Sequence, residues 1–163
     1  MGEVVEETHP VDGHVMHLRK DVAIPETMAD VSTFRGIEPE RVPSTYYVPP
    51  TLTDVVDRLT AHGVVVEALT SATKVSIEEF RIDASATAAT PFQNHAERTL
   101  AGAWRTAERE LPAGTLRIDL SQPRGRLAFY LIEPRSDDGL VNWNFLDVAL
   151  RDAEVYPIVR SRD

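Results

Sequence analysis

The sequence contains no cysteine. Disulfide bonds, thiolate catalysis and cysteine-ligated zinc sites are therefore excluded for this chain. Long hydrophobic runs are also absent, because the longest uninterrupted apolar run is Leu127–Ile132. A helix needs roughly 20 apolar residues to cross a bilayer. We therefore expect no membrane-spanning helix and no membrane partner.

Basic residues are scarce relative to acidic ones. The 163 residues include 17 Lys plus Arg against 26 Asp plus Glu, which gives a formal net charge of −9. Nucleic-acid binding usually requires a basic stripe, so we expect no nucleic-acid partner. The first residues, Met1–Glu7, are acidic where a secretory signal would be basic. Either the protein is not exported or its export signal lies upstream, and the compartment stays open.

Several catalytic motifs do not occur in the sequence. It has no His-x-x-Glu or His-Glu-x-x-His, no Gly-x-Ser-x-Gly and no phosphate loop of the Gly-x-x-x-x-Gly-Lys type. We therefore predict no catalytic residues in this chain. Three histidines cluster near one aspartate, at His9, His14, His17 and Asp12. Their spacing matches no zinc helix motif and the segment looks flexible, so the sequence predicts no metal site and no cofactor in this chain.

The composition is ordinary for a globular protein, with 42% hydrophobic and 26% charged residues. Prolines concentrate near the start, where apolar periodicity is weak and only Val15–Leu18 suggests a short strand. We predict that residues 1–43 form an extended, proline-rich arm or linker. Residues 44–163 are predicted to form a single α+β domain, to which the resemblance described below gives an accessory role.

Two segments have patterns that favour helices. The first has an apolar stripe at helical spacing, formed by Leu52, Val55, Val56 and Leu59. Gly63 then supplies a stop signal, so we predict a helix over residues 51–62. Residues 122–132 contain Pro123 near the start and are apolar on all sides. We predict a buried helix there, with a central strand as the alternative.

Most other segments have strand patterns. Residues 64–69 suggest a buried strand, 115–120 a half-buried one, and 156–159 a short last strand. Residues 74–83 alternate with a slip at Glu78-Glu79 that suggests a β-bulge or a bend. Residues 96–111 fit either a helix or a long hairpin strand. The predicted fold is therefore α+β and β-rich, with a mixed sheet, one or two helices (51–62 and 122–132) and an extended N-terminal arm.

Four residues are candidates for binding. Trp143, Asn142 and Arg126 are predicted to line a peptide or sugar groove, and His95 is a further candidate. Aromatic rings with polar neighbours form platforms for such ligands. Core packing is the alternative for Trp143, and a surface or hydrogen-bonding role is the alternative for His95.

Five segments of the second half form a distinctive pattern. They are Pro91–His95, Leu111–Gly114, Gln122–Leu127, Glu133–Asp147 and Tyr156–Val159. Together they resemble the C-terminal region of bacterial M14-type zinc carboxypeptidases, which follows the catalytic domain. The resemblance covers residues 43–160. It implies that this chain is a non-catalytic accessory region of an M14-like zinc metallocarboxypeptidase, with the catalytic domain of the same polypeptide as its partner.

The same resemblance implies zinc in that catalytic domain and none in this chain. Such enzymes hold zinc with a His-x-x-Glu pair and a second histidine, and none of the five histidines here starts such a pair. The implied full-length protein is an enzyme, whereas this chain alone is not. The alternative is a stand-alone peptide- or carbohydrate-binding module. A third possibility is a small enzyme that uses His95 with a nearby carboxylate.

Overall fold

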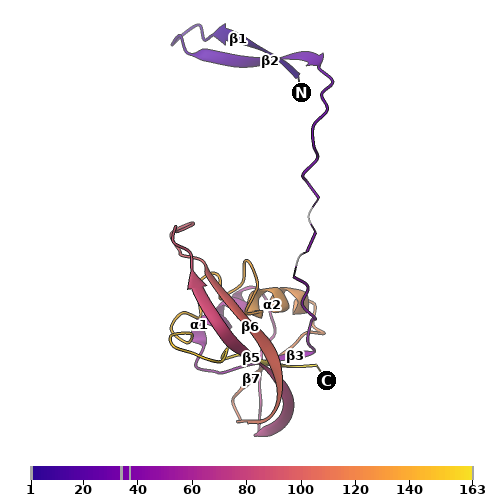
Figure 1. Cartoon of the computed structure of the whole chain (residues 1–163), viewed down its shortest axis with the longest axis vertical. Coiled ribbons are helices and arrows are strands. Elements are labelled where there is room, and N and C mark those ends of the chain that lie inside the picture. Colours follow the sequence, from indigo (N-terminus) through magenta and orange to yellow (C-terminus); the bar gives the residue numbers. More distant parts are fainter. Residues whose placement is uncertain (1, 34, 37, 163) are drawn as a thin grey trace. The chain divides into compact units, whose positions relative to one another are not determined.

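A computed structural model describes residues 2–33, 35–36 and 38–162 (Figure 1). The chain divides into two compact units, Met1–Pro39 and Glu40–Asp163, and each is described by itself. In the residues that the structure describes, no helix has the length and apolar character that crossing a membrane requires.

The first unit contains a β-hairpin. Strand β1 (Gly2–Thr8) pairs antiparallel with β2 (Val15–Ala23), and the register shifts between Gly2 and Val4. Residues 24–33 follow without helix or strand. The sequence pattern indicated only the start of β2, because charged residues interrupt the apolar alternation on both strands.

The second unit is built on a six-stranded sheet with the order β4-β7-β3-β8-β5-β6. Its strands are β3 (Thr45–Val48), β4 (Glu67–Ala68), β5 (Thr73–Thr87), β6 (Arg98–Leu111), β7 (Leu116–Asp119) and β8 (Val159–Ser161). With two helices beside this sheet, the predicted β-rich α+β class is confirmed. A mixed sheet was expected. The pairs that these strands form are antiparallel.

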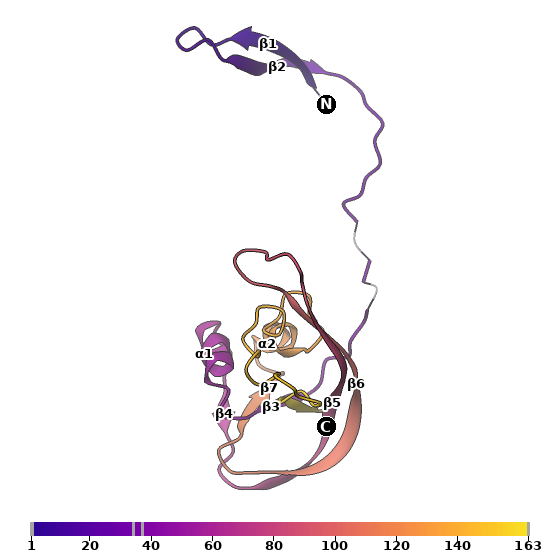
Figure 2. The ribbon, with the colours of Figure 1, turned by 60° about the vertical axis from the view of Figure 1, so that its left-hand side comes forward.

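Strands β5 and β6 form one long, curved hairpin (Figure 2). Residues 98–111 are therefore strand, not helix. The predicted bulge at Glu78-Glu79 is wrong, because the register shift lies between Ile82 and Ala84. Both faces of β5 are covered near Glu78: Ile77 belongs to one apolar cluster and Phe80 to another. The apolar residues thus change face with no extra residue at Glu78-Glu79, where the pairing is continuous.

Both predicted helices are present, as α1 (Thr53–Ala61) and α2 (Gly125–Ile132). Val55 and Leu59 of α1 are buried in the main core, which also contains Ile132 of α2. The predicted buried strand over residues 64–69 is wrong. Only Glu67–Ala68 pairs there, and both residues are exposed at the sheet edge.

Candidate functional site

The far end of the β5–β6 hairpin closes with a tight turn over Phe92–His95. The two end residues bond to each other through their backbones: Phe92 N–H donates to His95 O at 2.8 Å, and His95 N–H donates to Phe92 O at 2.9 Å. Gln93 and Asn94 have φ values of 46° and 66°, the left-handed pair that a type I′ turn requires. The turn therefore fixes the backbone position from which the His95 side chain projects.

The His95 imidazole stacks on the Trp143 indole, with ring centroids 4.0 Å apart and an interplanar angle of 20°. Phe92 approaches His95 edge-on at 6.3 Å. Both ring nitrogens of His95 are buried, and neither has a hydrogen-bond partner in the described part of the chain. The indole N–H of Trp143 donates to the carboxylate of Asp138. The structure therefore unites two of the four predicted binding residues in an aromatic stack.

The other two predicted binding residues lie differently. Asn142 is buried, and its carbonyl accepts the backbone N–H of Arg98 at 3.2 Å. Its role is to join the loop after α2 to strand β6. Arg126 is an exposed residue of α2. No contact in the described residues joins Arg126 to the His95–Trp143 stack, so the four do not form one groove.

The loop 142–147 is held against residues 96–98 by further bonds. Asn144 Nδ2 donates to Ala96 O at 2.9 Å, and Arg98 Nε donates to Asp147 Oδ1 at 2.7 Å. Asn144 itself has φ of 66°, a left-handed conformation that asparagine tolerates better than most residues. We call this junction, together with His95 and Trp143, the loop–strand seam.

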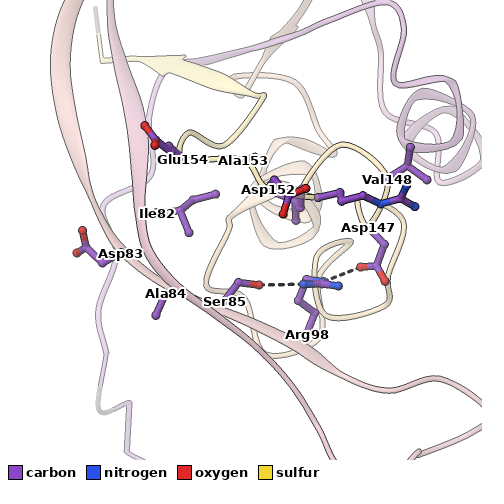
Figure 3. Close-up of a pocket in the computed structure, with 12 residues that line it drawn as sticks. Ile82, Asp83, Ala84, Ser85, Arg98, Asp147, Val148, Asp152, Ala153 and Glu154 are labelled. Atoms are coloured by element: carbon purple, nitrogen blue, oxygen red, sulfur yellow. Dashed lines mark hydrogen bonds and ion pairs between the residues drawn. The ribbon is translucent and has the colours of Figure 1, made fainter.

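An open pocket of about 610 Å³ lies beside the seam, next to the register shift of β5. Its polar centre is a line of three side chains, in which Arg98 reaches Asp147 on one side and Ser85 on the other (Figure 3). The carboxylates of Asp83 and Glu154 point away from this centre. Ser85 Oγ accepts from Arg98 Nη1 at 2.9 Å. No histidine is among the described residues that line the pocket.

A second cluster of charged residues is centred on a buried arginine in the core. Arg160 of β8 is fully buried, and its guanidinium contacts three carboxylates: Glu78 at 2.7 Å, Glu133 at 2.8 Å and Glu40 at 3.1 Å. Its Cζ also lies 3.8 Å above the ring of Trp104. This Arg160 cluster joins β8, β5, the end of α2 and the segment before β3.

Two tyrosines complete the polar core around Glu133. The Tyr46 hydroxyl donates to Glu133, and the Tyr156 hydroxyl donates to Ile132 O at 2.7 Å. Burial raises the pKa of Glu133, against the lowering effects of the Tyr46 hydroxyl and Arg160. Burial, together with the negative charge of Glu133, also raises the pKa of Tyr46 and Tyr156 well above the ordinary tyrosine value. None of these groups lines the pocket. Their pKa shifts are therefore a consequence of burial in the core.

The pKa of Glu40 predicts how stability depends on pH. Burial alone would raise this pKa, but the Arg41 backbone N–H and Arg160 hold it below its ordinary value of 4.5. A depressed carboxyl pKa contributes stability that is present above 4.5 and lost as the pH falls through the folded-state value. We expect Glu40→Gln to lower the free energy of unfolding by about 1 kcal/mol at pH 7, and the difference to vanish in strong acid.

Urea unfolding of both proteins between pH 7 and pH 3 measures this difference. The control is Glu108→Gln, at an exposed position of β6, which should change stability by less than about 0.5 kcal/mol. A difference between Glu40→Gln and the wild type that stayed constant over the whole pH range would contradict the role given to Glu40.

Sequence reasoning missed the Arg98–Asp147 pair and the Arg160 cluster. The partners of Arg98 lie 13 and 49 residues away, and those of Arg160 lie 27, 82 and 120 residues away. One signal was available: Arg160 directly follows the apolar pair Ile158–Val159, at the end of the strand predicted over residues 156–159. An arginine buried in a strand requires carboxylate partners.

Comparison with known proteins does not identify the function of the site. No family model, no curated protein and no solved structure matches the chain.

Proposed function

We propose that residues 40–163 are the non-catalytic accessory domain of an M14-like zinc metallocarboxypeptidase. The domain packs against the catalytic domain of the same polypeptide and stabilises it. One observation supports this most directly: the resemblance covers residues 43–160, and the second compact unit is Glu40–Asp163. The pattern in the sequence and the boundary of the folded unit agree within three residues at each end.

Several residues in the five segments that resemble the carboxypeptidase region have structural roles in the fold. Gly114 adopts φ of 86° in the turn between β6 and β7. Gly125 starts α2 so close to Leu120 that a Cβ atom would lie 1.9 Å from its carbonyl oxygen. Glu133 and Tyr156 supply the polar core. These structural roles explain why the pattern would be a signature of the fold. They support an accessory domain that catalyses no reaction by itself.

The test compares the natural gene product with a version that lacks residues 40–163. We expect the natural product to release C-terminal amino acids from peptides in a zinc-dependent reaction that a chelator abolishes. Deletion should lower its melting temperature and its soluble yield, because the catalytic domain then exposes the surface that the accessory domain covers. The 163-residue chain alone should release no amino acid. Zinc-dependent hydrolysis by that chain, or a deletion without effect, would refute the proposal.

The second candidate is a peptide- or carbohydrate-binding module. The stack of His95 on Trp143 beside the exposed Phe92 favours it, because aromatic surfaces with a polar edge recognise such ligands. Saturable binding of a peptide or oligosaccharide to the chain, lost in Trp143→Ala while the unfolding midpoint stays within a few degrees, would favour this candidate over the accessory domain.

A further inference from the structure

The tip of the β1–β2 hairpin brings two imidazoles and a carboxylate together. Thr8 and Val15 are the last paired residues of the ladder, so His9 and His14 face each other across the loop. His9 N–H donates to His14 O at 2.8 Å, and Gly13 N–H donates to His9 O at 3.0 Å. Gly13 has φ of 77°, a conformation that glycine adopts without strain and that lets this short loop close.

The loop then places Asp12 against both histidines. Its Oδ1 lies 2.9 Å from His9 Nδ1 and 2.6 Å from His14 Nδ1. The two imidazoles stack with centroids 4.7 Å apart and an interplanar angle of 15°. One ligand atom from each of the three residues fits within 4.8 Å of the other two. In the described residues, no other group of histidines and carboxylates meets this condition.

The donor set selects a class of metal ion. Two imidazole nitrogens and one carboxylate oxygen suit borderline ions such as Zn²⁺, whereas Mg²⁺ and Ca²⁺ prefer oxygen ligands alone. Tetrahedral zinc with bonds of about 2.0–2.2 Å needs donors roughly 3.3 Å apart. Side-chain rotation can supply that spacing, because the side chains of Asp12 and His14 are 59% and 58% exposed. The same exposure leaves an entry path and a coordination position for water.

A bound metal ion would also stabilise the hairpin, which has little hydrophobic burial of its own. Isolated two-stranded hairpins are at best marginally stable in water. The buried residues of the two hydrophobic clusters all lie in the second unit, and Val4, Val15, Leu18 and Val22 of the hairpin are exposed. A ligand that binds the closed turn but not the open chain stabilises the closed turn by mass action.

We propose that His9, Asp12 and His14 form a binding site for a zinc-like divalent cation that closes the tip of the β1–β2 hairpin. This site is independent of the zinc that the proposed catalytic domain would contain, and it does not depend on that proposal.

The hairpin contains its own control residue. His17 pairs with Glu6 across the strands, and its Nδ1 lies 3.7 Å from Glu6 Oε1. Successive residues of a strand point to opposite faces, so within β2 His17 lies on the face opposite Met16. His17→Gln therefore makes the same chemical change as His14→Gln three residues further along the chain, at a position outside the group of three donors.

The test is a titration of ZnCl₂ into the untagged 163-residue chain, followed by calorimetry and by the amide and imidazole NMR signals. We expect saturable binding of one zinc ion, with shifts confined to the hairpin tip. His14→Gln and Asp12→Asn should weaken it by about tenfold or more. His17→Gln should bind like the wild type, and MgCl₂ should cause no comparable shift.

Three results would overturn the site. They are the absence of saturable zinc binding, equal weakening by His17→Gln and His14→Gln, and unchanged affinity in both His14→Gln and Asp12→Asn. The NMR signals of residues 40–163 show whether each variant is folded. Because the turn is exposed and lies outside the core, these variants should leave those signals in place.

Discussion

Arg160→Leu is expected to destabilise the Glu40–Asp163 unit by about 3–5 kcal/mol, the usual cost of removing one partner of a buried ion pair. The side chain is fully buried, and its loss would remove the guanidinium that pairs with Glu133 and leave Glu78 paired with Arg162 alone. The cost would arise from unpaired buried charge as well as from lost volume. Since single small domains have only about 5–15 kcal/mol of stability, we expect much of the protein to be unfolded at moderate temperature.

Urea unfolding monitored by tryptophan fluorescence measures this loss, because Trp104 lies directly under the guanidinium. The matched control is Arg162→Leu. Arg162 also pairs with Glu78, at 2.9 Å, but its side chain is 39% exposed. Exposed ion pairs contribute about 0–1 kcal/mol, so this control should be nearly neutral. Equal destabilisation by the two substitutions would show that the Arg160 cluster is not the polar centre of the core.

Gly125→Ala is the second substitution with a large expected effect. An added Cβ would lie 1.9 Å from the backbone oxygen of Leu120 and 2.6 Å from its carbonyl carbon. Backbone atoms cannot move aside as a flexible side chain can, so α2 must shift away from the end of β7. Because α2 buries Ala128 and Ile132 in the core, we expect a loss of about 3 kcal/mol or more, the range of severe overpacking.

The comparison variant is Gly114→Ala. Gly114 has φ of 86°, but nothing lies within 4 Å of the Cβ position there. Only backbone strain is then added, at a cost of about 1–2 kcal/mol. Thermal unfolding of both variants separates the two causes. A Gly125→Ala melting temperature equal to or above that of Gly114→Ala would mean that α2 does not sit against Leu120 as described.

Local patterns predicted the elements whose burial is simple. The stripe of Val55 and Leu59 identified α1, and the apolar run ending at Ile132 identified α2, because each helix buries side chains in one core. The alternation over residues 115–120 likewise identified β7. These elements can be recognised without knowledge of distant partners.

Elements that depend on distant partners were harder to predict. Residues 64–69 have the composition of a buried strand, yet Val65 is 57% exposed because β4 is the sheet edge. The phase change near Glu78 looked like a bulge because the sequence does not reveal that both faces of β5 are covered. In both places the tertiary arrangement, not the local pattern, decides which side chains are buried.

The candidate site likewise has features that the sequence indicated and features that only the fold reveals. Aromatic character pointed to His95 and Trp143, but only the fold stacks them, across 48 residues of sequence. The spacing of His9, Asp12 and His14 matched no helical zinc motif, because a hairpin turn and not a helix brings the donors together. Motif spacings based on helices do not detect donors that a turn places side by side.

The most direct test of the central claim is the intact mass of the natural gene product, measured in the source cells by immunoblot with antibodies against residues 40–163 and by mass spectrometry. The proposed accessory role predicts a product much larger than the 18.1 kDa of this chain, with a zinc carboxypeptidase domain before the Glu40–Asp163 unit. A product of 18.1 kDa would contradict that role and would leave the binding module as the better account.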